Sequence, residues 1–136
     1  MERALLAYDG SDGAQRALRT AVELFRDRGI MVTVVGVAEG IPLYGFAGTL
    51  PSPEQEEERR RQLEEAGKTL AEHGIAFALV RRGGDSANAI LHEAEKEGVE
   101  LIVMGTRGLS APERWLLGSV STKVLQHAPC SVLVAR

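Results

Sequence analysis

Short apolar runs and helical repeats alternate along the chain. Five runs of apolar, largely β-branched residues show almost no polar alternation, which is typical of parallel strands covered on both faces. They cover residues 3–8, 30–37, 75–80, 101–104 and 131–135. The sequence therefore predicts five strands that lie side by side in one sheet.

The segments between these runs carry apolar residues at helical spacing and begin at capping residues such as Ser11 or Asp12 and Asp85 or Ser86. The predicted helices cover residues 12–28, 54–73, 86–97 and 120–128. Strict alternation of strands and helices predicts an α/β fold, a five-stranded parallel doubly wound sheet with helices on both faces.

Two segments depart from this regular pattern. Residues 39–53 are rich in glycine and proline and predict a long loop, whose Tyr44 and Phe46 either cover a ligand or pack on the domain. The helix that follows begins with charged residues on all sides, including Arg59-Arg60-Arg61, so its first turns are expected to project into solvent.

Length and charge narrow the possible functions. The 136 residues fit one domain, residues 1–136, and the formal net charge of −3 gives no electrostatic footprint for nucleic acid. No apolar run approaches the ~20 residues that span a bilayer, and no signal peptide precedes the first strand. We expect a cytoplasmic protein that binds neither nucleic acid nor membranes.

Cysteine and histidine suggest no metal or disulfide chemistry. Cys130 is the single cysteine and is expected to be a buried small residue. The histidines at 73, 92 and 127 are scattered, and His73 and His127 are expected at helix ends.

The segment from Leu101 to Val124 has the pattern strand, glycine-rich loop, helix. The apolar run breaks at Gly105, glycine recurs at Gly108, and a helix restarts at Gly118-Ser119. Glycines let backbone amides approach a ligand closely, and the positive end of a helix favours an anion. We therefore expect a phosphate cradle, to which Arg107 and the hydroxyls of Ser119 and Ser121 contribute.

Ligands of such sheets bind beyond the carboxyl ends of the strands, where the strand order reverses. If the first and fourth strands are neighbours, Asp9 faces the glycine loop across one crevice. Asp9 then bonds a ribose hydroxyl or coordinates Mg²⁺ shared with the phosphates, or it simply caps the turn into the first helix. Ala7 and Val37, at neighbouring strand ends, are placed to contact a base.

The common nucleotide motifs are absent from the sequence. There is no Gly-x-x-x-x-Gly-Lys-Ser/Thr loop and no Gly-x-Gly-x-x-Gly after the first strand, so neither a P-loop ATPase nor an NAD dehydrogenase is supported. A flavodoxin needs its phosphate loop after the first strand, where this chain is acidic. A receiver domain needs an aspartate where this chain has Val80-Arg81-Arg82.

The spacing Gly105-x2-Gly108-x9-Gly118-Ser119 is similar to the Gly-x2-Gly-x9-Gly-Ser/Thr motif of the ATP-binding branch of the universal stress protein family. The stretches Tyr8-Asp9-Gly10-Ser11 and His-Ala-Pro-Cys-Ser-Val-Leu-Val extend this resemblance to both ends of the chain. It implies strand order 3-2-1-4-5 in an adenine nucleotide alpha hydrolase-like fold, with ATP or another adenine nucleotide in the crevice. It also implies homodimerisation through the last strand and a stress-associated signalling role. The binding residues expected from the family pattern and the crevice are Ala7, Asp9, Val37, Met104, Gly105, Arg107, Gly108, Gly118, Ser119, Val120 and Ser121.

The sequence does not decide whether a bound nucleotide is hydrolysed. The first hypothesis is a nucleotide-binding regulatory module with slow or no hydrolysis, and the second is a weak ATPase that uses Mg²⁺ held near Asp9. The third is a dimeric interaction protein whose glycine loop binds no nucleotide. The last strand supports a dimer independently, because Ser131–Ala135 would leave an apolar sheet edge that natural proteins usually cover.

Overall fold

The computed structural model describes residues 1–38, 41–42, 49–50, 52–106 and 117–136. Its main sheet is parallel and has the strand order β5-β2-β1-β6-β7, which confirms the order 3-2-1-4-5 expected for the five predicted strands. These strands are β1 (Arg3–Ala7), β2 (Met31–Ala38), β5 (Phe77–Gly83), β6 (Leu101–Gly105) and β7 (Ser131–Ala135).

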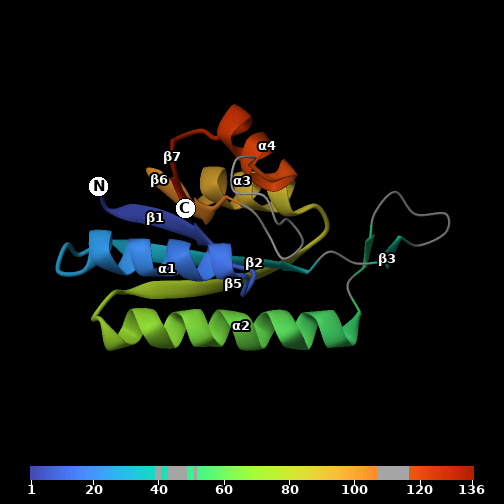
Figure 1. Cartoon of the computed structure of the whole chain (residues 1–136), viewed down its shortest axis with the longest axis horizontal. Helices are drawn as coiled ribbons and strands as arrows, with labels where there is room; N and C mark the ends of the chain where they lie inside the picture. Colours follow the sequence, from blue (N-terminus) through green and yellow to red (C-terminus); the bar gives the residue numbers. More distant parts are fainter. Residues whose placement is uncertain (39–40, 43–48, 51, 107–116) are drawn as a thin grey trace.

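The helices form a layer on each side of this sheet. α1 (Asp12–Phe25) and α2 (Pro53–Glu72) cover one face, while α3 (Ser86–Glu97) and α4 (Ser119–His127) cover the other (Figure 1). Two apolar cores result, because successive strand side chains point to opposite faces. In β1, Leu6 packs with the core under α1 and α2, whereas Leu5 packs with the core under α3 and α4. Both leucines are fully buried, which contributes about 1.5–3 kcal/mol each.

Local hydrogen bonds explain where the helices begin and end. The Ser11 hydroxyl accepts from the Ala14 N–H at 3.1 Å and caps α1, so Ser11 and not Asp12 is the cap of the two residues that the sequence offered. Asp85 caps α3 in the same way through the Asn88 N–H at 2.9 Å, and Gly98 ends that helix in the left-handed region at φ +60°. α4 differs from both, because its N-cap is Gly118, which offers no side-chain cap.

Two of the expected boundaries need correction. β5 continues through Arg81 and Arg82 to Gly83 instead of ending at Val80. It is the end strand of the sheet, so it alternates between half-buried and exposed side chains and tolerates arginine. The stretch expected to be a loop contains β3 (Ile41–Pro42) and β4 (Thr49–Leu50), which pair in an antiparallel manner. Tyr44 and Phe46 lie outside the described residues.

The exposure of α2 and the positions of two histidines agree with the sequence-based expectations. The first turns of α2, residues 53–58, are exposed. His73 lies at the end of α2, with its Nδ1 atom 2.8 Å from the Thr69 carbonyl oxygen, and His127 ends α4. Cys130 was expected to be buried and is only half-buried, and this partial burial raises the pKa of its thiol. Of the helices that the structure describes, none combines the length and apolar character needed to cross a bilayer.

Candidate functional site

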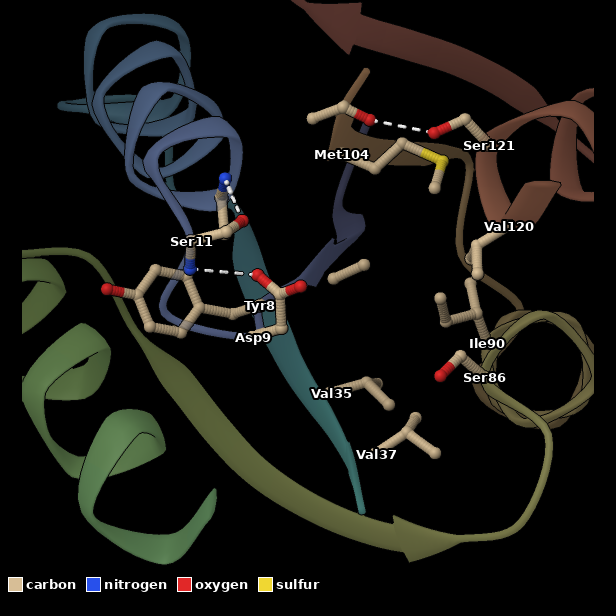
Figure 2. A pocket seen from close by; sticks show the side chains of 13 residues that line it. Tyr8, Asp9, Ser11, Val35, Val37, Ser86, Ile90, Met104, Val120 and Ser121 are labelled. Carbon is tan, nitrogen blue, oxygen red and sulfur yellow. Dashed lines mark hydrogen bonds between the residues drawn. The ribbon is translucent and has the colours of Figure 1, made fainter. Parts of the chain in front are cut away.

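A cavity of about 90 Å³ lies at the carboxyl ends of the central strands (Figure 2) and is called the nucleotide cavity after the ligand that the sequence predicts. The pairing of Leu6 with Val103 makes β1 and β6 neighbours, as predicted, so their carboxyl ends meet at this cavity. Residues of β2, α3 and α4 close its remaining sides. Its lining consists of Ala7, Tyr8, Asp9, Ser11, Ala14, Val35, Val37, Ser86, Ile90, Met104, Gly105, Val120 and Ser121.

One wall of the nucleotide cavity is apolar. Val35 and Val37 alternate along β2 and therefore point to the same face of the sheet, where Figure 2 shows them near Ile90 of α3. Val120 of α4 joins them from above in the same view. A wall of branched aliphatic side chains suits the flat face of a planar ring and offers it no hydrogen bond.

The opposite wall carries one carboxylate. The Ser11 N–H donates to Asp9 Oδ1 at 2.9 Å, so Asp9 does hold the turn into α1, as the simplest interpretation of the sequence proposed. Figure 2 shows the other carboxylate oxygen on the cavity side of this bond. The capping role occupies one oxygen, and the second faces the space where a ligand would lie.

Tyr8 precedes this carboxylate but faces away from it. Its ring extends toward α2, and the residue is only 6% exposed. Burial raises the pKa of Tyr8, and the negative charges of Glu65 and Asp9 add to that effect. The neutral phenol thus belongs to the core under α1 and α2. The side chain of Tyr8 points to this core, and that of the next residue, Asp9, points to the cavity.

The wall between β6 and α4 is held by main-chain hydrogen bonds. The Gly118 N–H donates to the Thr106 carbonyl at 2.8 Å. The Ser121 hydroxyl is buried and lies 2.9 Å from the Gly105 carbonyl oxygen and 3.0 Å from that of Thr106. A hydroxyl has a single proton, so Ser121 uses its donor to hold this wall together. We had expected this hydroxyl to face phosphate, and the structure instead gives it carbonyl partners.

The start of α4 offers backbone N–H groups on the same side. The helix begins at Ser119, and its first intrahelical bond joins the Thr122 N–H to the Gly118 carbonyl at 3.0 Å. The N–H groups of Ser119, Val120 and Ser121, which come before Thr122, have no acceptor within the helix. Together with the positive end of the helix dipole, they favour an anion at this position.

Gly105 is needed for packing as well as for access. A Cβ atom at this position would lie 2.6 Å from the Gly13 carbonyl carbon and 2.7 Å from its oxygen. Only glycine allows β6 to end this close to the first turn of α1. The sequence pattern assigned Gly105 to ligand approach alone, because the partner backbone is distant in sequence.

The structure brings most of the expected site residues together. Seven line the cavity: Ala7, Asp9, Val37, Met104, Gly105, Val120 and Ser121. Gly118 and Ser119 lie at the start of α4 without lining it, and Arg107 and Gly108 lie outside the described residues.

Several lining residues were missed by the sequence analysis. Two carried a usable signal, since Val35 precedes Val37 by one strand repeat and Ile90 follows Ser86 by one helical turn. The others become visible only once the strands are ordered. They are Tyr8, Ser11, Ala14 and Ser86.

Comparison with known proteins identifies the family. The model of the universal stress protein family matches residues 1–136. The chain belongs to this family. A universal stress protein in the QAH/OAS sulfhydrylase 3′ region of Thermus aquaticus is 43% identical over 137 residues, which cover 97% of this chain and 96% of that protein. Universal stress protein YxiE of Bacillus subtilis is 34% identical over 143 residues and 97% of each chain.

A solved universal stress protein gives the cavity a chemical context. The protein from Archaeoglobus fulgidus in complex with dAMP is 26% identical to this chain, with a TM-score of 0.77. The match covers 100% of this chain and 98% of that one. That relative therefore binds an adenine nucleotide.

The side chains of this universal stress protein offer few ligands for a metal ion. Within the described ranges, no three or more His, Cys, Asp or Glu side chains gather closely enough to hold one. Mg²⁺ is often held by one or two carboxylates while phosphates and water complete its shell. A single carboxylate at Asp9 is compatible with that mode, which requires that a bound phosphate supply further ligands.

Proposed function

We propose that this universal stress protein binds ATP, or another adenine nucleotide, in the nucleotide cavity. One observation carries the proposal: an apolar wall and a helix start without a side-chain cap meet at a single cavity beside one carboxylate. The dAMP complex of the Archaeoglobus fulgidus relative supports an adenine nucleotide as the ligand class. ATP is favoured because the glycine spacing of residues 105–119 provides several amides for a chain of phosphates.

In the proposed arrangement the base lies against Val35 and Val37, and the phosphates point to the start of α4. Arg107 and Gly108 complete the phosphate side according to the motif. Asp9 accepts from a ribose hydroxyl or binds Mg²⁺ that the phosphates share. The two walls differ in polarity, and this difference sets the direction of the nucleotide.

We further propose that the protein is a regulatory module of the stress response with slow or no hydrolysis, and that it is a homodimer. The apolar side chains Val132, Leu133 and Val134 of β7 are only half-buried at the end of the sheet order. Pairing with a second copy would cover them and satisfy the strand edge.

The decisive experiment is acid release and chromatography of nucleotide from freshly purified protein, combined with thermal unfolding in Mg-ATP. We expect an adenine nucleotide in the extract, or a rise in Tm with Mg-ATP. An empty extract together with an unchanged Tm would contradict the proposal and leave the interaction-protein hypothesis.

A variant tests the geometry of the phosphate side. Gly118→Val should still fold, because Gly118 has extended backbone angles that any residue adopts (φ −67°, ψ 168°). The branched side chain at the start of α4 should weaken ATP affinity by at least about tenfold, since it blocks close approach to the amides. Leu125→Val, on the exposed face of the same helix, is the matched control. Equal ATP affinity in all three proteins would contradict the assigned phosphate position.

Turnover is measured separately as phosphate release. We expect wild type and Asp9→Ala to release phosphate at the same contaminant-level rate. A faster rate that disappears in Asp9→Ala would instead establish the weak ATPase.

A further inference from the structure

A second cavity, of about 210 Å³, lies on the other face of β2. It is lined by Ala38, Glu56, Arg59, Arg81, Arg82 and Gly83, and we call it the arginine cavity. It shares no lining residue with the nucleotide cavity, because Val37 and Ala38 point to opposite faces of the sheet. Figure 1 shows the beginning of α2 beside the carboxyl ends of β2 and β5, where these residues meet.

Arg59 is held in this cavity by the backbone of β2. A Cβ atom at Gly36 would lie 2.8 Å from Arg59 Cδ and 2.9 Å from Cγ, so the aliphatic stem of the arginine crosses the strand at a glycine. The guanidinium donates from Nη1 to Gln62 Oε1 at 2.7 Å. Its Nε atom is buried and has no hydrogen-bond partner among the described residues. A buried donor without an acceptor is unfavourable, so the protein leaves the hydrogen-bonding capacity of this guanidinium partly unused.

Arg81 brings a second guanidinium to the same place. It is the β5 partner of Gly36, the residue that the Arg59 stem crosses. Arg81 is exposed and forms no ion pair with any residue that the structure describes. Two cations gathered on neighbouring elements repel each other unless an anion lies between them.

Neither Glu56 nor Glu57 forms an ion pair with Arg59 or Arg81 in the described part of the chain, although Arg60 and, to a smaller extent, Arg81 lower the pKa of Glu57. Arg82 points to the opposite face and forms an ion pair with the fully buried Glu93.

The neighbours of Arg59 on α2 show the opposite behaviour. Arg60 pairs with Glu57 and Arg61 with Glu58, each with the acid three residues earlier. Arg59 has Glu56 at the same spacing but bonds Gln62 instead. Of three consecutive arginines, the one that faces the cavity is the one without a carboxylate partner in the described residues.

We propose that the arginine cavity binds the phosphoryl oxyanion of a small phosphorylated molecule, separately from the nucleotide. The guanidinium groups of Arg59 and Arg81, two residues that line the cavity, hold its oxygens. Guanidinium groups suit this task because they carry several donors in a fixed plane and keep their charge. Such a site would let the protein sense a phosphorylated metabolite while the nucleotide cavity is occupied or empty.

Calorimetric titration with inorganic pyrophosphate tests the proposal. The titration is done in the Gly118→Val background, so that the phosphate side of the nucleotide cavity does not contribute. We expect saturable binding that weakens by at least about tenfold in Arg59→Gln and in Arg81→Gln, since each removes a charged donor. Arg61→Gln is the matched control, because it removes the same charge from an exposed position of α2 and should change the affinity less than about twofold.

Further variants distinguish a specific binding site from non-specific electrostatic attraction of the anion. Arg59→Lys keeps the charge but lacks the planar guanidinium with its several fixed donors, and we expect it to bind nearly as weakly as Arg59→Gln. Arg81→Gln keeps the test valid if Arg59 variants fold poorly, since Arg81 is exposed. Absent pyrophosphate binding, equal losses in all three glutamine variants, or full affinity in Arg59→Lys would each overturn the proposal. Pyrophosphate binding without nucleotide binding in wild type would overturn only the proposed function.

Discussion

The nucleotide cavity and the arginine cavity lie on opposite faces of β2, and their walls are built in different ways. Main-chain contacts fix the nucleotide cavity: Ser121 ties the end of β6 to α4, and Gly105 lies against the Gly13 backbone. Side chains form the arginine cavity, in which the long stem of Arg59 crosses β2 at Gly36.

This difference affects how each cavity responds to mutation. A backbone contact cannot adjust without moving a strand or helix. Substitutions at the backbone contacts of the nucleotide cavity should therefore reduce the stability of the whole domain. A long side chain can rotate away. Substitutions in the arginine cavity should therefore abolish anion binding with only a small loss of stability. The following predictions test this contrast.

The largest expected effect is that of Gly105→Ala. The added Cβ atom would lie 2.6 Å from a Gly13 backbone atom, and neither backbone can yield without separating β6 from α1. We expect the free energy of unfolding to fall by about 3 kcal/mol in urea titrations. Gly74→Ala is the control, since Gly74 has φ +68° but no atom within 4 Å of a Cβ, and should lose only about 1 kcal/mol. Equal losses would show that the contact with Gly13 is not the cause.

Ser121→Ala should have the next largest effect. It removes a buried hydroxyl and leaves the carbonyl groups of Gly105 and Thr106 without this donor. We expect a loss of about 2 kcal/mol in unfolding free energy, and weaker ATP binding because the wall loosens. Ser119→Ala, at an exposed position of the same helix, should change stability by less than about 0.5 kcal/mol. A Ser121→Ala protein as stable as that control would contradict the role assigned to the hydroxyl.

Gly36→Ala tests the arginine cavity in the same way. The new methyl group displaces the Arg59 stem, and we expect a stability loss of only about 1 kcal/mol because the side chain can move. Pyrophosphate affinity should fall as far as in Arg59→Gln, while ATP affinity stays unchanged. A double-mutant cycle with Arg59→Ala provides the check, since the methyl group should cost less when the stem is absent. An identical cost in both backgrounds would rule out displacement of Arg59 as the cause.

The smallest effect concerns Tyr8, which packs toward α2 beside the nucleotide cavity. Burial raises the pKa of this phenol above its usual value of 10.0, so the folded state holds the proton more tightly than the unfolded state. The stabilisation is complete below about pH 10 and is lost as the pH rises through the folded pKa. Unfolding free energies at about pH 8 and pH 10.5 should therefore fall less steeply in Tyr8→Phe than in wild type. Parallel slopes would show that Tyr8 does not contribute.

Most of the fold followed from local sequence signals. The apolar runs and the caps at Ser11 and Asp85 act within a few residues, so they determine the elements without tertiary information. β5 was predicted too short for a physical reason. A strand at the end of a sheet tolerates Arg81 and Arg82, so its end has no apolar signature.

The site was predictable only as far as strand order determines it. Once β1 and β6 are neighbours, Asp9 and Gly105 must meet at their carboxyl ends. The partners of Ser121 and Gly105 could not be predicted, because they depend on how closely backbones approach. Arg59 was interpreted as part of a solvated face, since its neighbours in sequence are arginines too. Only the glycine at position 36 of another element distinguishes it.

The hydrogen bond between the Gly118 N–H and the Thr106 carbonyl has an evolutionary consequence. At 2.8 Å it joins Thr106 and Gly118, the residues on either side of positions 107–117, so the two ends of this segment are held together. Closing a longer segment between such ends costs only about 0.6 kcal/mol for each doubling of its length. Different residues can therefore occupy the positions between Gly108 and Gly118 while β6 and α4 keep their positions. The domain has a built-in place where specificity can diversify without a new fold.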